Sequence, residues 1–172
     1  MKKSLLAVGL FAGAMVSSAA FAADGTVNFT GSITGTACKI DTASKDQTVD
    51  LGKISSTAFN EAGSTAGAKQ FIIKINECPE GVKAAMVRFD GTQVPGNDAV
   101  LALNNDAGKA TNVGIQISDN DNNVINLYQN SSVFALTTGD NKLNFTARYY
   151  ALAKDVTPGV ANAVTNFTIV YP

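Results

Sequence analysis

Residues 23–36 read Ala-Asp-Gly-Thr-Val-Asn-Phe-Thr-Gly-Ser-Ile-Thr-Gly-Thr. Val27, Phe29 and Ile33 fall on one side of this stretch with a period of two, and Gly31 lies between them in the same row. Such alternation is typical of a β-strand with one buried face. A glycine inside an apolar strand row often marks the close approach of another backbone. Two interpretations stay open from this stretch alone: the first strand of an ordinary sandwich, or a strand that pairs in the groove of another molecule.

A targeting segment precedes this stretch. The chain begins with Met-Lys-Lys, continues with an apolar run over residues 5–16, and reaches Ala-Phe-Ala at residues 20–22, a small-x-small cleavage site. The apolar run is too short for a membrane anchor, which needs about 18 apolar residues. We therefore expect residues 1–22 to be a signal peptide. The apolar row at Val27 then lies in the free N-terminus of the mature chain, where it can leave the body of the domain.

Composition excludes several classes of function. The 172 residues carry 13 Lys and Arg against 14 Asp and Glu, a net charge of −1, which gives no footprint for nucleic acid or an anionic membrane. The chain has no histidine, so Ser-His-Asp and Cys-His arrangements are excluded. We expect no enzyme activity, no catalytic residue and no cofactor.

One acidic segment resembles the start of a calcium loop. Residues 119–123 read Asp-Asn-Asp-Asn-Asn, but Val124 stands where such a loop needs glycine and Asn130 where it needs an acidic residue. We favour a polar hairpin turn over a metal site.

The chain contains two cysteines, Cys38 and Cys78. In an exported protein they are most simply a disulfide. Closing a loop of roughly 40 residues stabilises a fold by about 4 kcal/mol in the chain-entropy model. A reactive thiol or a metal pair is disfavoured, because no histidine or further cysteine completes a site.

Beyond Cys38 the sequence indicates strands and turns in one domain with no convincing helix. The longest one-sided apolar row begins at Leu143 and ends at Ala151, directly after the turn residues Gly-Asp-Asn at 139–141. Short strands at this spacing predict a β-sandwich. The expected strands cover residues 48–54, 70–78, 84–89, 100–103, 113–117, 124–128, 133–136, 143–151 and 165–171, with a loop and one helical turn between residues 55 and 69.

The last expected strand has an exposed edge. Phe167, Ile169 and Tyr171 alternate with polar or smaller residues, and only Pro172 follows. Natural edge strands are blunted by charge or proline, and residues 166–170 carry neither. Free strands at both ends of a sandwich invite pairing with another chain.

At this point the sequence resembles the pilin subunits of the chaperone–usher pathway, in the type 1 fimbrial family. The resemblance covers the whole mature chain. It rests on the Val-x-Phe-x-Gly-x-Ile row at 27–33, the cysteine pair, Phe-Thr-Ala-Arg-Tyr-Tyr at 145–150, Asn-Phe-Thr-Ile-Val-Tyr at 166–171 with its penultimate aromatic residue, and Gly159, fourteenth from the end. It implies an all-β fold: an incomplete immunoglobulin-like β-sandwich, residues 36–172, which a donor strand from another chain completes.

The resemblance also implies roles for particular residues. Residues 23–35 would be an N-terminal donor-strand extension. Its donor residues would be Val27, Phe29, Gly31 and Ile33, and the residues of the groove and of chaperone binding would be Gly159, Phe167, Ile169 and Tyr171. The implied partners are neighbouring pilin subunits, a periplasmic chaperone and an outer-membrane usher.

The implied function is that of a structural fimbrial subunit that polymerises through its extension and supports surface adhesion. Such a protein is exported through the periplasm and assembled in the extracellular fimbrium. The short lead before Val27, and Gly25 in the inward row, leave a shaft or an adaptor position open. The alternative is a monomeric secreted β-sandwich binding module, in which residues 23–36 form its own first strand.

Overall fold

The computed structural model describes residues 24–31, 33 and 37–172. The expected signal peptide, residues 1–22, lies outside the described residues, as do residues 23, 32 and 34–36 of the quoted stretch. The chain divides into two units, residues 1–33 and residues 34–172. In the first unit, residues 24–31 and 33 form neither a helix nor a strand.

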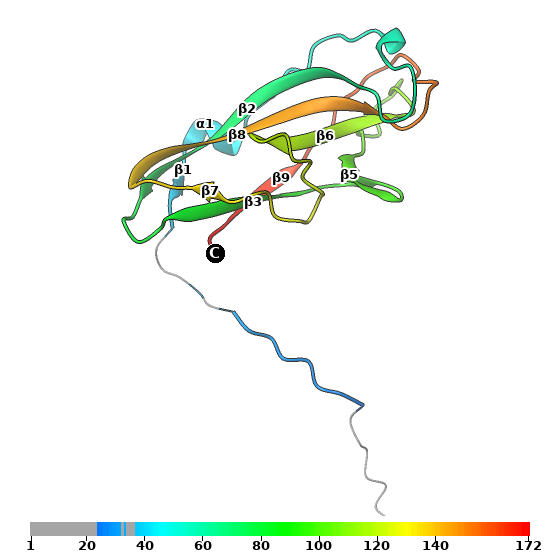
Figure 1. Ribbon diagram of the computed structural model, residues 1–172. Helices are drawn as coiled ribbons and strands as arrows, with labels where there is room; N and C mark the ends of the chain where they lie inside the picture. Colours follow the sequence, from blue (N-terminus) through cyan, green and yellow to red (C-terminus); the bar gives the residue numbers. More distant parts are fainter. Residues whose placement is uncertain (1–23, 32, 34–36) are drawn as a thin grey trace, which may run out of the picture. The chain divides into compact units, whose positions relative to one another are not determined.

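The second unit consists of two antiparallel sheets that face each other (Figure 1). The strand order is β1-β2-β8-β6-β5-β4 in the larger sheet and β7-β3-β9 in the smaller one. The larger sheet contains β1 (Lys39–Ile40), β2 (Thr65–Cys78), β8 (Gly139–Ala151), β6 (Val113–Asp119), β5 (Asn97–Leu101) and β4 (Gln93–Val94), and the smaller contains β7 (Phe134–Ala135), β3 (Ala84–Asp90) and β9 (Asn166–Val170). Only a short helix, α1 (Thr42–Lys45), and a 3-10 turn, η1 (Ser56–Ala58), interrupt the described strands. The predicted all-β fold is confirmed.

A cluster of aromatic side chains joins the two sheets. Phe145 on β8 stacks on Phe71 of β2, with ring centroids 5.5 Å apart. It also meets Phe89 of β3 and Phe134 of β7 edge-on, at 5.2 and 5.3 Å. Edge-on and offset pairs of this kind contribute about 0.5–1.5 kcal/mol each beyond their burial. The predicted apolar row of residues 143–151 therefore supplies the centre of the core.

Two expected strands are wrong. Residues 48–54 alternate as predicted but form no strand, because their backbone has no ladder partner among the described residues. Residues 124–128 make one isolated bridge, between Val124 and Ser118. The N–H groups of Ile125, Leu127 and Tyr128 donate to carbonyls of three different strands, at Ile117, Asp98 and Phe89, so no continuous ladder forms. Periodicity detects an apolar face, whereas a strand also needs a neighbour with which to pair.

β2 begins earlier than predicted, at Thr65 instead of residue 70. Thr65 and Ala66 pair with Tyr150 and Tyr149 on β8, and the register shifts before Lys69. A bulge of this kind inserts an extra residue, which interrupts the alternation by which a strand is recognised in sequence.

The polar segment after β6 is a turn held by one buried carboxylate. Asp119 is 1% exposed, and its Oδ1 accepts hydrogen bonds of 2.9 Å from the backbone N–H groups of Asp121 and Asn123. Burial alone would raise the pKa of Asp119, but hydrogen bonds from the Ser132 hydroxyl and the two amides outweigh it, so the pKa lies below its ordinary value of 3.8. Asp119 would stand at the first position of a calcium loop, and its carboxylate instead accepts hydrogen bonds from the backbone of its own turn.

Replacement of Asp119 by Asn should weaken the fold at neutral pH. Charge-assisted hydrogen bonds are about twice as strong as neutral ones, so we expect a loss of about 1–2 kcal/mol in the free energy of unfolding. Because the folded-state pKa is depressed, the carboxylate stabilises fully above pH 3.8 and loses its contribution as the pH falls through the folded-state value. Denaturant unfolding at a series of pH values should show the difference between Asp119→Asn and the wild type shrinking below pH 3.8.

The control is Asp121→Asn in the same turn, since Asp121 accepts only a surface hydrogen bond, from the Asn120 side chain at 3.2 Å. That variant should unfold like the wild type. A pH-independent difference for Asp119→Asn would contradict the role of its charge.

Candidate functional site

The described body contains an open groove of about 1000 Å³. Two continuous segments border it: residues 45–54, here called the N-wall, and residues 156–167, here called the C-wall. Apolar side chains of the sheets also line it: Phe71, Ile73, Phe89, Leu101, Ile115, Ile117 and Ala147. The groove therefore gives access to the same aromatic cluster that joins the sheets.

The N-wall is an extended edge without a ladder. Lys45 ends α1, and beyond it no backbone group of residues 47–54 pairs with another backbone group in the described part of the chain. Its contacts to the sheet are made by side chains: Gln47 Nε2 donates to the Ile72 carbonyl at 3.4 Å, and Ile54 lies against Gly67. These contacts place residue 47 beside Ile72 and residue 54 beside Gly67, so the N-wall runs antiparallel to β2 and parallel to β8.

The C-wall leads into β9, which among the described strands pairs on one side only. β9 pairs with β3 and is the last strand of its sheet, so its other edge is open (Figure 1). Val164, two residues before β9, is 69% exposed. Exposed backbone and apolar groups at one edge are the features that favour strand addition.

The two walls run in opposite directions. The Tyr149 hydroxyl donates to the Ala161 carbonyl at 3.4 Å, near the end of β8. Phe167 pairs with Phe89, whose ring contacts Phe145, earlier in β8. The C-wall is therefore antiparallel to β8 and to the N-wall. A strand inserted between the walls would be parallel to one and antiparallel to the other.

Tyr149 also lies in the groove, where its hydroxyl remains a donor at neutral pH. Burial and the negative charge of Asp50, on the N-wall, both raise the pKa of Tyr149 above its ordinary value. The groove thus contains a neutral phenol and an apolar surface, with charged side chains on its N-wall.

The structure separates the four residues expected in the groove. Gly159 and Phe167 line it. Ile169 and Tyr171 do not; they are half-buried and pack against the main core. The N-wall was missed as part of the site, although the alternation of Val49 and Leu51 was a signal for an extended segment.

The expected donor residues lie in the other unit. The exposed fractions of Val27, Phe29 and Ile33 are 75%, 93% and 102%. A Cβ added to Gly31 would meet no heavy atom within 4 Å. The row expected to be the donor therefore has large apolar side chains that are exposed, which is unusual for a stretch with a strand pattern.

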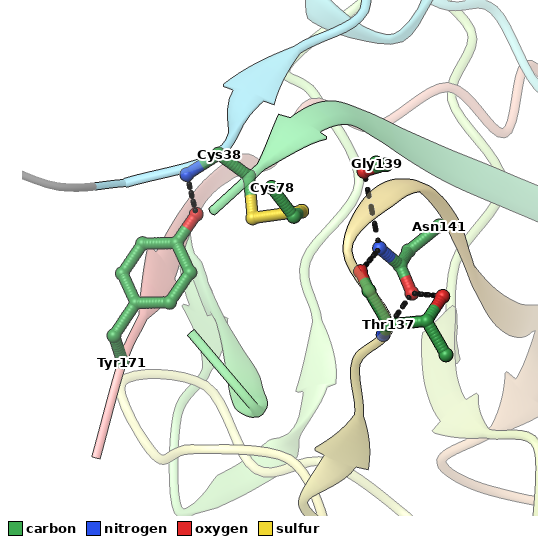
Figure 2. Close-up of a disulfide and its surroundings, with 6 residues drawn as sticks. All are labelled: Cys38, Cys78, Thr137, Gly139, Asn141 and Tyr171. Atoms are coloured by element: carbon green, nitrogen blue, oxygen red, sulfur yellow. Dashed lines mark hydrogen bonds between the residues drawn. A yellow bond between two sulfur atoms is a disulfide. The ribbon is translucent and has the colours of Figure 1, made fainter. Parts of the chain in front are cut away.

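The predicted disulfide is confirmed. Cys38 and Cys78 are bonded, which connects the residue before β1 to the last residue of β2 (Figure 2). On the other side of Cys38, its backbone N–H donates to the Tyr171 hydroxyl at 3.1 Å. Tyr171 is thus joined to the start of the second unit.

Other kinds of site have little support. Within the residues that the structure describes, no group of three or more His, Cys, Asp or Glu side chains is placed to hold a metal ion. A search of the same residues finds no helix with the length and apolar character needed to cross a membrane.

Gly159 has a packing role that its place in the sequence does not reveal. A Cβ at this position would lie 2.5 Å from the Gly108 carbonyl oxygen and 2.6 Å from the Lys109 carbonyl carbon. Val160, next in the chain, bridges Lys109, and its N–H donates to the Gly108 carbonyl at 2.9 Å. Only glycine allows the C-wall to approach this backbone so closely.

Gly159→Ala should therefore displace the C-wall. We expect a loss of about 1–3 kcal/mol in the free energy of unfolding, the usual cost of overpacking. The matched control is Gly81→Ala, since a Cβ there meets nothing within 4 Å. Thermal or denaturant unfolding of both variants measures the effect. Equal free energies of unfolding for the two variants would show that the C-wall can shift to make room for the added methyl group.

Comparisons with known proteins agree with this architecture. Residues 27–172 match the family described as Fimbrial protein. The chain is 43% identical over 150 residues to the type-1 fimbrial protein C chain of Escherichia coli, covering 86% of this chain and 83% of that protein. It is 40% identical over 179 residues to the type-1 fimbrial protein A chain of Escherichia coli strain K12, covering 98% of each.

A solved chaperone–usher pilus structure shares the fold. The TM-score is 0.67 at 26% identity, over 87% of this chain and 96% of that one. The two antiparallel sheets with an open groove match the incomplete immunoglobulin-like sandwich of pilins, so this part of the fold prediction is confirmed. The monomeric binding module is not supported. The chain belongs to the fimbrial protein family and is a structural subunit of a chaperone–usher fimbrium.

Proposed function

We propose that the subunit polymerises by donor-strand complementation, in which residues 23–35 of one copy, or of a related subunit, enter the groove of the next. The observation that carries this proposal is the groove of about 1000 Å³ between two backbone segments that lack ladder partners on that side. Addition of a strand to an open edge is an established mode of recognition, and chaperone–pilin pairs are among its known examples.

The donor row has the side chains that such a groove requires. Val27, Phe29 and Ile33 are each at least 75% exposed, and full burial of side chains of this size contributes about 1.5–3 kcal/mol apiece. The inserted backbone would pair with the N-wall and with the open edge of β9, which satisfies polar groups that otherwise face the groove. The donor would complete a core, which is a larger gain than docking on a flat surface.

The same groove accounts for the proposed chaperone. An exposed apolar cleft is an aggregation hazard during export. A periplasmic chaperone that lends a strand would cover the cleft, and an outer-membrane usher would bring the next donor to replace it. Export itself would use residues 1–22 as a signal peptide.

Phe167→Asp should abolish capture by the chaperone. Phe167 lines the groove, and an unpaired carboxylate at this position costs several kcal/mol on burial under a lent strand. Thr168→Asp is the matched control, because Thr168 is the next residue of β9 and its side chain is exposed. Co-purification with the cognate chaperone should fail for Phe167→Asp and persist for Thr168→Asp. Equal yields from the two would remove the groove from chaperone binding.

Gly31→Leu should block polymerisation without affecting the fold of the subunit. The added side chain meets no neighbour in the described chain, but it would clash where the donor and groove backbones approach most closely. Thr30→Leu, which points to the other side of the row, should be tolerated. Fibre length by electron microscopy, measured beside the yield of chaperone complex, tests this. Normal fibres from Gly31→Leu would falsify the donor role, and an unfolded Gly31→Leu subunit would favour residues 23–36 as an internal strand.

A further inference from the structure

The Tyr171 hydroxyl connects two parts of the subunit that have different proposed tasks. Tyr171 directly follows β9, the strand whose open edge borders the groove. Cys38 lies directly before β1, near the N-terminal end of the second unit, and residues 23–35 precede it in the sequence. Figure 2 shows the phenol reaching the Cys38 backbone, with a hydrogen bond of 3.1 Å between residues 133 positions apart.

Among the described residues, the Tyr171 hydroxyl is the one hydrogen-bond acceptor for the Cys38 amide. The ladder between β1 and β2 starts one residue later, at Lys39 and Asn76. Cys38 is 8% exposed, and a buried N–H without a partner is costly. The disulfide holds the Cys38 side chain to β2, while the Tyr171 hydroxyl holds its backbone to the strand of the smaller sheet.

The hydroxyl is available for this contact over the working pH range. Burial raises the pKa of Tyr171, and the hydrogen bond from the Cys38 amide lowers it by less, so the net shift is upward. The phenol therefore stays neutral well above pH 7.

We propose that Tyr171 is a positioning residue, whose hydroxyl couples the acceptor strand of a subunit to the root of that subunit's own donor segment. This inference rests on the proposed donor-strand function. When an incoming strand pairs with β9, Tyr171 would keep the backbone of Cys38 in place, three residues after the proposed donor segment ends. The proposed coupling affects how a subunit delivers its own donor segment to another subunit. Uptake of an incoming strand depends instead on the groove, which Tyr171 does not line.

Tyr171→Phe tests the hydroxyl while retaining the ring that packs on the core. Tyr128→Phe is the matched control, because the Tyr128 hydroxyl also bonds a backbone group, the Gly91 carbonyl at 2.6 Å, away from Cys38. In chaperone-bound full-length subunits, hydrogen exchange at the Cys38 amide should accelerate about five- to tenfold in Tyr171→Phe, the effect of one lost hydrogen bond. It should be unchanged in Tyr128→Phe.

Two half-reactions then separate positioning from stability. Donation is the rate at which a Tyr171→Phe chain inserts into a labelled full-length Gly31→Leu subunit, which cannot itself donate. Acceptance is the rate at which a Tyr171→Phe, Gly31→Leu chain takes a strand from the wild type. Donation should slow about five- to tenfold, in line with the loss of one hydrogen bond, and acceptance should stay at the level of Gly31→Leu alone.

Unchanged exchange at Cys38, or an equal fall in donation and acceptance, would overturn the coupling. If Tyr171→Phe does not fold, hydrogen exchange in the wild-type subunit still tests the proposal. Exchange of the wild-type Cys38 amide at the rate of an unprotected amide would show that the Tyr171 hydroxyl does not hold it. Failure of the proposed function would give a different result. Wild-type chains would then not insert into the Gly31→Leu subunit at all, whereas hydrogen exchange at the Cys38 amide could still be measured and compared.

Discussion

Backbone N–H and C=O groups beside an apolar groove need partners, and this requirement governs the subunit. In a complete sandwich, neighbouring strands would satisfy the N-wall and the outer edge of β9. Here the two segments border a groove of about 1000 Å³ and lack ladder partners on that side within the described residues. The remaining core is well formed, since Ile73, Val87 and Phe145 are at most 1% exposed. The domain thus has a buried core between its paired strands and an open groove beside β9.

Sequence periodicity predicted the elements that combine an apolar row with a partner in the same chain. The rows of β3, β6, β8 and β9 fall where expected. β3 and β8 alternate between more and less buried residues, whereas β6 is buried on both faces. The same signal failed for residues 48–54, whose apolar row faces a groove instead of a neighbouring strand. A period of two reports which side chains are apolar and says nothing about whether a second backbone is present. This wrong strand and the missed N-wall therefore have one physical cause.

The site shows a similar division between local and long-range information. Phe167 could be placed in the groove because its row belongs to a strand with an open edge. Gly159 lines the groove, and the backbone of residues 108–110 that it approaches could not be identified from spacing alone. The hydrogen bond between Tyr171 and Cys38 lay beyond prediction as well, because it depends on how two sheets bring distant residues together. The turn at residues 119–123 was easier to predict, because Asp119 accepts hydrogen bonds from residues that are close to it in the sequence.

The opposed directions of the two walls give the groove a polarity. A strand that enters has one parallel and one antiparallel neighbour, so insertion in the two possible senses forms different hydrogen-bond ladders. In the proposed contact, donor and acceptor are also different surfaces, which would make the contact between copies heterologous and let it repeat without closing into a ring. A fibre built from such contacts has every subunit facing the same way and two chemically unlike ends. One end presents an empty groove and the other an unused strand, so a cell needs two distinct means of terminating the same polymer.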